Sequence, residues 1–324
     1  TCARRGGVER SRALRTTKPG MDAAVWKEMA EQGWLGILIP DSHGGQSLGF
    51  AEMAVVAEEL ARTLGPEPLV GSGVFAASLI AASGNERLKT ELLPALASGQ
   101  RIAGVGFASR FNDLDLSQTG VTATASGADV TLQGTVHHVY PALCATDFIV
   151  AARKGTELSL YRIPADAKGL TCTDELRADG TYAGNLTLKD VRIGEADLIA
   201  SGTAAVDAFR RAGDAATIIS CAELYGCMDQ ALDITLNYLK TRVQFGKPIG
   251  SFQALQVRCV ELHLQKELAH GALHDAIRTL DDAKATADQL SMAASRAKSR
   301  CGDVAHQIGR EAVKLHGAIG FTDE

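Results

Sequence analysis

The chain has 324 residues, a hydrophobic content of 46% and a formal net charge of −5 at pH 7. This length and composition exclude a disordered protein and allow two or three packed layers or subdomains around a sizeable core. The mild negative charge and the lack of a long Lys/Arg run give no electrostatic reason to expect a nucleic acid or an anionic membrane as partner. We interpret the basic start, Arg4-Arg5 through Arg15, as a solvated segment.

The cysteines and the apolar runs indicate in which cellular compartment the protein is expected. The seven cysteines form an odd set without a CxxC pair and without His at zinc-ligand spacing, so we expect no metal site and a reducing environment. No run reaches the roughly 18 apolar residues that a membrane span needs, and the first residues lack the apolar core of a secretory signal. The sequence therefore predicts a cytoplasmic protein without a membrane partner.

Residues 1–100 predict an N-terminal α-helical domain. From about residue 21 the apolar positions recur three or four apart, as in Val56, Leu60 and Leu64. Breakers such as Pro40 and Gly65-Pro66 separate the helical segments.

Residues 101–200 have a different texture and predict a middle antiparallel β-domain. Apolar residues alternate with polar ones around Val121 and Val130, with a turn-like segment between them at 126–129. Further strand-like runs cover 147–152, 158–163 and 184–191.

Residues 201–324 return to the helical period and predict a C-terminal bundle of long helices. A break at 246–250 and a turn at Asp281-Asp282 divide the bundle, and the last helix is expected to end at Gly317 with a left-handed cap. The whole chain thus reads as an α+β protein in the order helical domain, β-domain, helical bundle, which is an uncommon order.

Three motifs resemble the acyl-CoA dehydrogenase family. The most specific is YLKTRVQFGKPIGSFQALQ at 238–256. GWLGILIP at 33–40, followed by HGG at 43–45, resembles the family's N-terminal helical domain, and HGAIGFT at 316–322 resembles its C-terminal glycine motif. The resemblance extends over nearly the whole chain and implies an FAD-dependent enzyme.

By this resemblance Arg242 reaches the FAD of a neighbouring subunit, and Phe245, Phe252 and Gln253 shape the same site. A guanidinium fork suits a pyrophosphate because it binds two oxygens at once, which a lysine does not. The alternative is that Arg242 is a solvated helix end and that the aromatic residues are core.

The glycine motif implies further cofactor contacts. Gly317 and Gly320 would let the backbone approach FAD closely, although simple helix termination accounts for them equally well. Lys314 stands where the family usually has Gln, so a hydrogen bond to FAD is either lost or replaced by contact with a phosphate.

The catalytic base departs from the family pattern. The implied reaction removes the α-proton of an acyl-CoA thioester with a carboxylate while the β-hydride passes to the flavin. Most members carry this Glu beyond the glycine motif, past Glu324, and a second group carries it at the position of Ala216. Glu223 lies seven residues further along the same helix, roughly 10 Å away. It is either a relocated base or an ordinary polar residue at a helix or subunit contact.

The β-domain departs as well. The family's flavin-wrapping loop is replaced by the sequence at 106–113, and its Trp-Ile-Thr segment by His138-Val139-Tyr140. Tyr140 either contacts a flavin edge or packs at the surface or in the core. We interpret the His137-His138 pair as structural, because adjacent strand residues point to opposite faces.

A retained arginine motif combined with altered flavin contacts resembles the heterotetrameric acyl-CoA dehydrogenases of actinobacterial steroid breakdown. The resemblance implies a homo- or heterotetramer with another chain of this family, acting on a fatty-acyl or steroid-type CoA thioester. Electron-transfer flavoprotein would accept the electrons. The alternatives are a catalytically silent subunit that completes its partner's FAD site, and a flavin oxidase or monooxygenase on the same scaffold.

Overall fold

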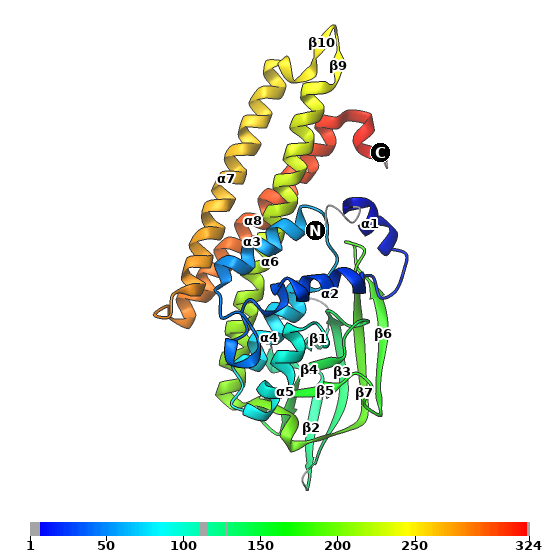
Figure 1. Cartoon of the computed structure of the whole chain (residues 1–324), viewed down its shortest axis with the longest axis vertical. Coiled ribbons are helices and arrows are strands. Elements are labelled where there is room, and N and C mark those ends of the chain that lie inside the picture. Colours follow the sequence, from blue (N-terminus) through cyan, green and yellow to red (C-terminus); the bar gives the residue numbers. More distant parts are fainter. Residues whose placement is uncertain (1–6, 111–115, 128, 323–324) are drawn as a thin grey trace. The chain divides into compact units, whose positions relative to one another are not determined.

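A computed structural model describes residues 7–110, 116–127 and 129–322 of the chain (Figure 1). It divides into two compact units. The first comprises Thr1–Met53 and Pro66–Ala216, and the second comprises Ala54–Gly65 and Thr217–Glu324. The division predicted at residues 100 and 200 stays a prediction about the domains.

The first unit begins with short helices, as the apolar spacing predicts. They are α1 (Gly7–Leu14), α2 (Ala23–Glu31), the start of α3 (Phe50–Ala61), a π-helical segment (Leu69–Ala76), α4 (Ala77–Ala81) and α5 (Glu86–Ala97). Two of these helices begin at side-chain caps. The Asp22 carboxylate accepts a hydrogen bond from the Ala24 amide at 2.8 Å, and Asn85 accepts one from the Leu88 amide at 3.2 Å.

The interpretation of the basic start as solvated is wrong at Arg10. Its side chain is only 9% exposed and forms an ion pair with Glu67, whose side chain is fully buried. The two residues are 57 positions apart, so tertiary packing, not local sequence, places this charge inside. Arg12 and Arg15 are exposed as expected, and Arg4-Arg5 lie outside the described residues.

The sheet of the first unit is mixed rather than purely antiparallel. Its strands are β1 (Ala103–Gly106), β2 (Val121–Ser126), β3 (Asp129–Val139), β4 (Asp147–Lys154), β5 (Glu157–Pro164), β6 (Leu170–Leu176), β7 (Tyr182–Gly194) and β8 (Leu198–Ser201). They are ordered β6-β7-β3-β2-β4-β5-β8, with β1 pairing β4. The β1–β4 and β2–β4 pairings are parallel, and the others are antiparallel.

Each face of this sheet covers its own hydrophobic core. On one face Ile149 and Leu160 pack against Leu88 and Leu92 of α5 and against α4, and Figure 1 shows both helices against the strands. The other face gathers Phe148, Tyr161 and Leu186 into a second core made by the strands themselves. Strand β4 is buried along most of its length because it contributes to both cores.

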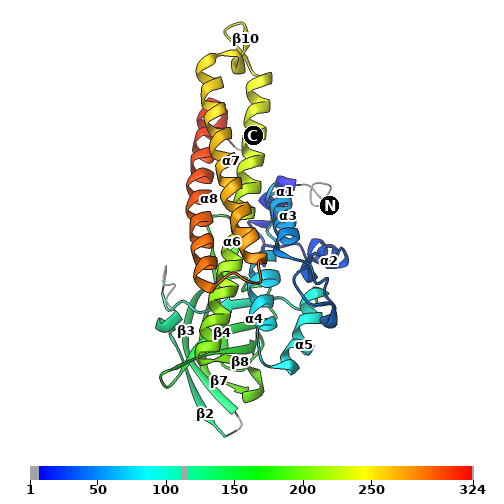
Figure 2. The ribbon, with the colours of Figure 1, turned by 90° about the vertical axis from the view of Figure 1, so that its left-hand side faces the viewer.

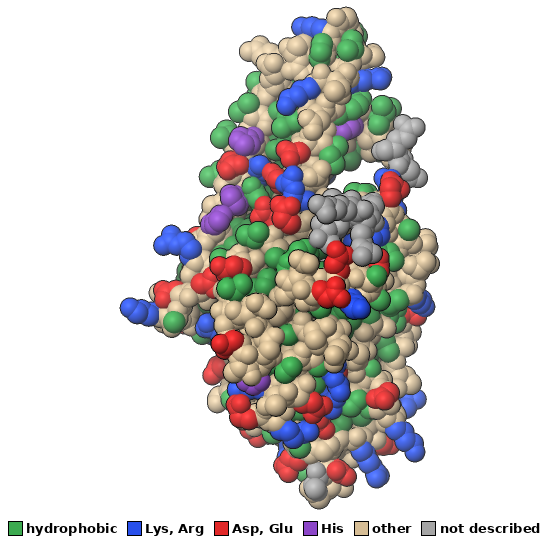
Figure 3. Space-filling model, viewed as in Figure 1, with side chains coloured by type: hydrophobic (Ala, Val, Ile, Leu, Met, Phe, Trp, Pro, Cys, Tyr) green, Lys and Arg blue, Asp and Glu red, His purple; other side chains and the backbone are tan. Residues whose placement is uncertain are grey.

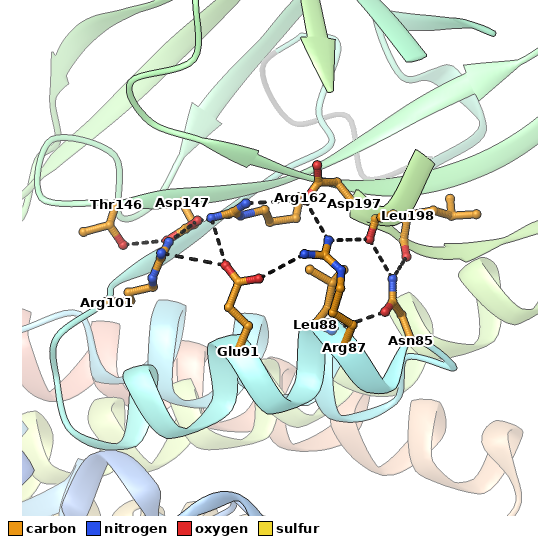
Figure 4. Close-up of polar contacts among 11 residues, drawn as sticks. Asn85, Arg87, Leu88, Glu91, Arg101, Thr146, Asp147, Arg162, Asp197 and Leu198 are labelled. Carbon is orange, nitrogen blue, oxygen red and sulfur yellow. Dashed lines mark hydrogen bonds and ion pairs between the residues drawn. The ribbon is translucent and has the colours of Figure 1, made fainter. Parts of the chain in front are cut away.

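An ion-pair network fastens α5 to the start of β4 and the end of β5 (Figure 4). Asp147, which is 2% exposed, accepts hydrogen bonds from Arg101 at 2.8 and 2.9 Å and from Arg162 at 2.7 Å. Glu91 on α5 lies 3.6 Å from the Arg162 guanidinium and 3.8 Å from that of Arg101. Burial opposes the charge of Arg162, but the carboxylates of Asp147, Asp197 and Glu91 raise its pKa. The network joins three segments distant in sequence.

The second unit is built from long helices. Helix α6 (Gly202–Thr241) enters it at Thr217, and α7 (Gln253–Asp281) and α8 (Ala287–His316) lie side by side in both ribbon views (Figures 1 and 2). A two-stranded hairpin, β9 (Val243–Gln244) and β10 (Lys247–Pro248), separates α6 from α7. Helix α7 ends at Asp281, where the predicted turn occurs, and α8 begins with a capping box at Thr286.

Gly226 lets α6 approach the end of α3 closely. A Cβ atom there would lie 2.1 Å from the carbonyl oxygen of Glu58 and 2.9 Å from its carbon, both of which are backbone atoms. We expect Gly226→Ala to lower the free energy of unfolding by about 1–3 kcal/mol, because the backbone must shift to admit the methyl group.

Gly213→Ala is the matched control on the same helix. A Cβ at Gly213 meets nothing within 4 Å, so this change should stabilise the chain by about 0.5–1 kcal/mol through helix propensity. Chemical denaturation measures both variants, and equal stability of Gly226→Ala and the natural chain would contradict the close approach.

Candidate functional site

The segment between α6 and α7 presents the arginine motif on an exposed hairpin. Phe245 and Gly246 occupy the turn with positive φ angles of +54° and +78°. The amide of Ile249 donates a hydrogen bond of 2.9 Å to the carbonyl oxygen of Arg242, which ties the end of α6 to the residues that lead into α7.

Arg242 lies at the base of this hairpin, between the end of α6 and β9. Its side chain is exposed, and no carboxylate in the described part of the chain pairs with it. Phe245 is 89% exposed and meets the half-buried Phe252 edge to face at 6.1 Å. The ammonium of Lys247 lies 4.4 Å from the centre of the Phe252 ring. Phe252 is thus partly covered by its own chain, whereas Arg242 and Phe245 are accessible to a ligand or to another chain.

The beginning of α7 adds backbone donors beside these cations. Phe252 stands at the N-cap and provides no side-chain cap, and the exposed Gln253 is the first helical residue. The first amide groups of a helix carry about half a positive charge. An uncapped helix start near Arg242 and Lys247 is chemically suited to bind a phosphate-containing group.

The glycine motif ends α8. Gly317 has φ +65° and ψ −137° and forms the C-cap, so the predicted termination is observed, although its ψ angle differs from that of a left-handed helical residue. Gly320 lies in the 3-10 helix Gly317–Phe321 that follows α8, and a Cβ there would lie 2.4 Å from the carbonyl oxygen of Val313 in α8, so close packing against α8 already requires glycine. Lys314 is exposed and forms an ion pair with Glu311 at 2.6 Å.

A contact that the sequence did not reveal joins the two motifs. The ring of Tyr238 stacks on His316 with centroids 4.4 Å apart, and its hydroxyl donates to the His316 carbonyl oxygen at 3.3 Å. Tyr238 lies in the motif at 238–256 and His316 in the motif at 316–322. Their place in these motifs was the signal in the sequence that could have indicated the contact. The contact brings the glycine motif beside the last turn of α6, one turn before Arg242.

Tyr140 belongs to the first unit and has contacts of its own there. Its hydroxyl donates to the carbonyl oxygen of Pro66 at 3.3 Å, and Arg177 lies 4.7 Å from the centre of its ring. It lines a small pocket together with Pro66, Pro68 and Pro141. A flavin contact of Tyr140 stays a prediction. Of the replaced loop at 106–113, residues 111–113 lie outside the described part of the chain.

Glu223 lies on α6 in the second unit and is half-buried. The thiol of Cys227, one helical turn further on, has its pKa raised to about 11 by burial and then by the charge of Glu223. Glu223 therefore lies in a partly desolvated setting, and its role as a base stays a prediction.

The second unit also contains a polar cluster that the sequence did not predict. Asp229 on α6 pairs with Arg62, which follows α3, and with Lys266 of α7 at 2.6 Å. Burial acts to raise the pKa of Asp229, but the hydrogen bonds and charges of Lys266 and Arg62 outweigh it and hold that pKa low. The pKa of Glu58 is raised, by burial and then by Asp229. We interpret this cluster as a structural tie between three helical segments.

Tyr225 and His270 extend the same cluster. Their rings stack with centroids 4.4 Å apart and an interplanar angle of 11°. Burial, followed by the neighbouring His274, lowers the pKa of His270. Within the described ranges, no group of three or more His, Cys, Asp or Glu residues is arranged to hold a metal ion. The same part of the chain contains no helix that is both long and apolar enough to cross a membrane.

Two family models match the chain. Acyl-CoA dehydrogenase, N-terminal domain, matches residues 7–100, and Acyl-CoA dehydrogenase, C-terminal domain, matches residues 214–324. Acyl-CoA dehydrogenase IpdE2 of Mycolicibacterium smegmatis is 28% identical over 317 residues, which cover 98% of this chain and 83% of that protein. The probable acyl-CoA dehydrogenase YngJ of Bacillus subtilis is 28% identical over 314 residues, covering 93% and 81%.

Solved structures agree with these matches. A variant of the Tcur3481–Tcur3483 steroid ACAD is 32% identical with a TM-score of 0.84, covering 97% of this chain and 82% of that one. The ChsE4–ChsE5 complex from Mycobacterium tuberculosis has the same fold, with a TM-score of 0.86, 24% identity and coverage of 97% and 82%.

The chain therefore belongs to the acyl-CoA dehydrogenase family, a family of FAD-dependent oxidoreductases. The predicted family, the α+β fold with its helical, β and helical regions, and FAD as the family's cofactor are confirmed.

Proposed function

We propose that the chain is a subunit of an FAD-dependent acyl-CoA dehydrogenase that oxidises a CoA thioester to its 2-enoyl-CoA in the cytoplasm. The observation that carries the proposal is the exposed guanidinium of Arg242 beside the uncapped start of α7. A fork-shaped cation together with the first amides of a helix suits the charge of a pyrophosphate and its several oxygen acceptors.

The residues at this end of the second unit divide the task of holding FAD. Arg242 and the first amides of α7 would bind the pyrophosphate, and Gln253 would donate a further hydrogen bond. Phe245 is 89% exposed, and its ring would leave water when it covers the nucleotide. Burial of this ring would favour the binding of a partner. These groups point away from their own chain's core, which supports an FAD that belongs to an adjoining subunit.

The bound flavin supplies the hydride acceptor for the reaction. A carboxylate removes the α-proton of the thioester while the β-hydrogen leaves with its electron pair, so the substrate loses two hydrogens and gains a double bond. We propose electron-transfer flavoprotein as the partner that would accept the electrons. The likeness to the steroid ACAD Tcur3481–Tcur3483 supports a steroid-type thioester as one substrate class.

An apolar stripe on α7 supports assembly with another chain of this family. Val257, Val260, Leu264 and Leu268 follow at helical spacing and are between 51% and 59% exposed. Figure 3 shows hydrophobic side chains along the edge that α7 forms. Single chains rarely expose contiguous apolar patches of this kind without a partner. We propose a homo- or heterotetramer in which the stripe contacts another subunit.

A second candidate is a catalytically silent subunit that completes its partner's FAD site. The observation that favours it is Ala216, which occupies one family position of the base with a side chain unable to take a proton. Glu223 is the alternative base on the same helix.

Anaerobic absorbance spectroscopy separates the two candidates. A dehydrogenase should be yellow and should lose its visible flavin absorbance when an acyl-CoA or steroid-CoA is added. Glu223→Gln should then abolish the bleaching while flavin content stays constant, because the amide cannot accept the α-proton. Gln230→Glu, a change at another half-buried position of α6, tests whether any altered charge on this helix has the same effect.

Two outcomes would redirect the proposal. Full bleaching in Glu223→Gln would remove Glu223 as the base. A colourless chain that becomes active only with a second chain would support the silent subunit, and hydrogen peroxide formation during turnover would favour an oxidase.

A further inference from the structure

Two histidines converge on the outer surface of α7. His270 and His274 are four residues apart and therefore lie on the same face of the helix. Their Nε2 atoms are 2.9 Å apart, and the two rings are inclined at 76° with centroids separated by 4.3 Å. At this separation one Nε2–H donates a hydrogen bond to the other Nε2, so the two nitrogens face each other beside the helix.

The packing around the pair orients it. Tyr225 of α6 stacks flat on the His270 ring, at 4.4 Å and 11°, and His270 is half-buried against it. His274 is exposed, so the hydrogen bond between the two Nε2 atoms is open to solvent. The His270 ring is therefore held in place by Tyr225, while the His274 ring contacts it from the solvent-exposed side.

The separation of the two nitrogens suits one kind of ion. Imidazole nitrogens that occupy adjacent positions of a square or octahedral ion, at bond lengths of about 2.0–2.1 Å, are about 2.9 Å apart. A tetrahedral ion at the same bond length needs about 3.4 Å. The observed 2.9 Å is the length of the hydrogen bond between the two rings, and it equals the right-angled separation, so an ion of this kind can replace the shared proton without the nitrogens moving apart.

We infer that His270 and His274 form a two-imidazole site on α7 for a divalent transition-metal ion of square or octahedral preference, such as Ni²⁺ or Cu²⁺. Water fills the remaining positions, since no third His, Cys, Asp or Glu of the described residues joins the pair. Both nitrogens bind through their lone pairs, so the proton shared between them moves to a ring Nδ1 and no net proton is released. The site is independent of FAD and of the proposed reaction.

Calorimetric titration of the tag-free protein with Ni²⁺ tests the inference. We expect one equivalent to bind per chain and to raise the midpoint of thermal unfolding, because the ion binds the folded helix. His270→Ala and His274→Ala should each lose this binding, since a single imidazole remains. His263→Ala is the matched control, an exposed histidine on the same helix whose nearest carboxylate, Glu267, lies 3.9 Å away.

The titrations either support or exclude the metal site. Loss of binding in the two pair variants, with retention in His263→Ala, would establish the site. Failure of the natural protein to bind Ni²⁺, equal binding in all variants, or a preference for Zn²⁺ over Ni²⁺ would overturn the assignment.

Discussion

Replacing Asp147 with alanine should lower the free energy of unfolding by about 3–5 kcal/mol, the cost of breaking a buried ion pair by removing one partner. Asp147 is 2% exposed and accepts hydrogen bonds from Arg101 at 2.8 and 2.9 Å, from Arg162 at 2.7 Å and from Thr146 at 2.7 Å. The substitution leaves Arg162, itself only 9% exposed, without its nearest carboxylate.

Arg101 loses less than Arg162, because its side chain is 33% exposed and is able to turn toward water. Arg162 keeps Glu91 at 3.6 Å and Asp197 at 3.4 Å, which limits the loss to the stated range. Asp147→Asn, which keeps the shape and removes the charge, should lie between the natural protein and Asp147→Ala.

Urea denaturation followed by circular dichroism measures these differences. Glu86→Ala is the control, because Glu86 is an exposed residue of α5 that pairs with Lys89 at the surface. It should leave the denaturation midpoint unchanged. A loss below about 1 kcal/mol for Asp147→Ala would mean that the network of Figure 4 is a surface feature in solution.

Arg242→Ala should weaken FAD binding by the assembled protein about ten- to a hundredfold, the equivalent of about 1.5–3 kcal/mol for a hydrogen bond to a charged group. The guanidinium is exposed and has no carboxylate partner in the described part of the chain, so its removal should leave folding intact. Arg242→Lys should restore only part of the affinity, because an ammonium keeps the charge without the fork.

The flavin-to-protein ratio and a fluorescence titration of the apoprotein with FAD measure this effect. Arg258→Ala is the control, because Arg258 is an exposed arginine of α7 that pairs with Glu311 at 3.5 Å. The experiment uses the oligomer, with its partner chain if one is required. An unchanged flavin content in Arg242→Ala would contradict the role proposed for this residue.

Much of the architecture was predictable because local periodicity reflects burial. The alternation in β2 and β3 and the apolar stripe of α6 follow the faces that these elements bury. Helices α7 and α8 end at Asp281-Asp282 and at Gly317, where these residue types predict a helix end. The less regular strands β1, β6 and β8 were not predicted, since β1 and β8 are four residues long and β6 is an exposed edge strand.

The candidate site was predictable in its residue types but not in its geometry. The motif at 238–256 identified Arg242, Phe245, Phe252 and Gln253, while the stacking of Tyr238 on His316 and the uncapped start of α7 required the structure. At Gly320 the structure adds a reason that the motif did not contain, the approach of its own backbone to Val313.

The amino-acid sequence by itself determined the family, the order of helical and β regions and the residues of the arginine motif, because these depend on spacing along the chain. The tertiary structure alone decided which charges are buried. Arg10 meets Glu67, Asp147 meets Arg101 and Arg162, and Asp229 meets Arg62 and Lys266. The physical reason is that the cost of burying a charge depends on a partner far away in sequence, and only folding brings that partner within hydrogen-bonding distance.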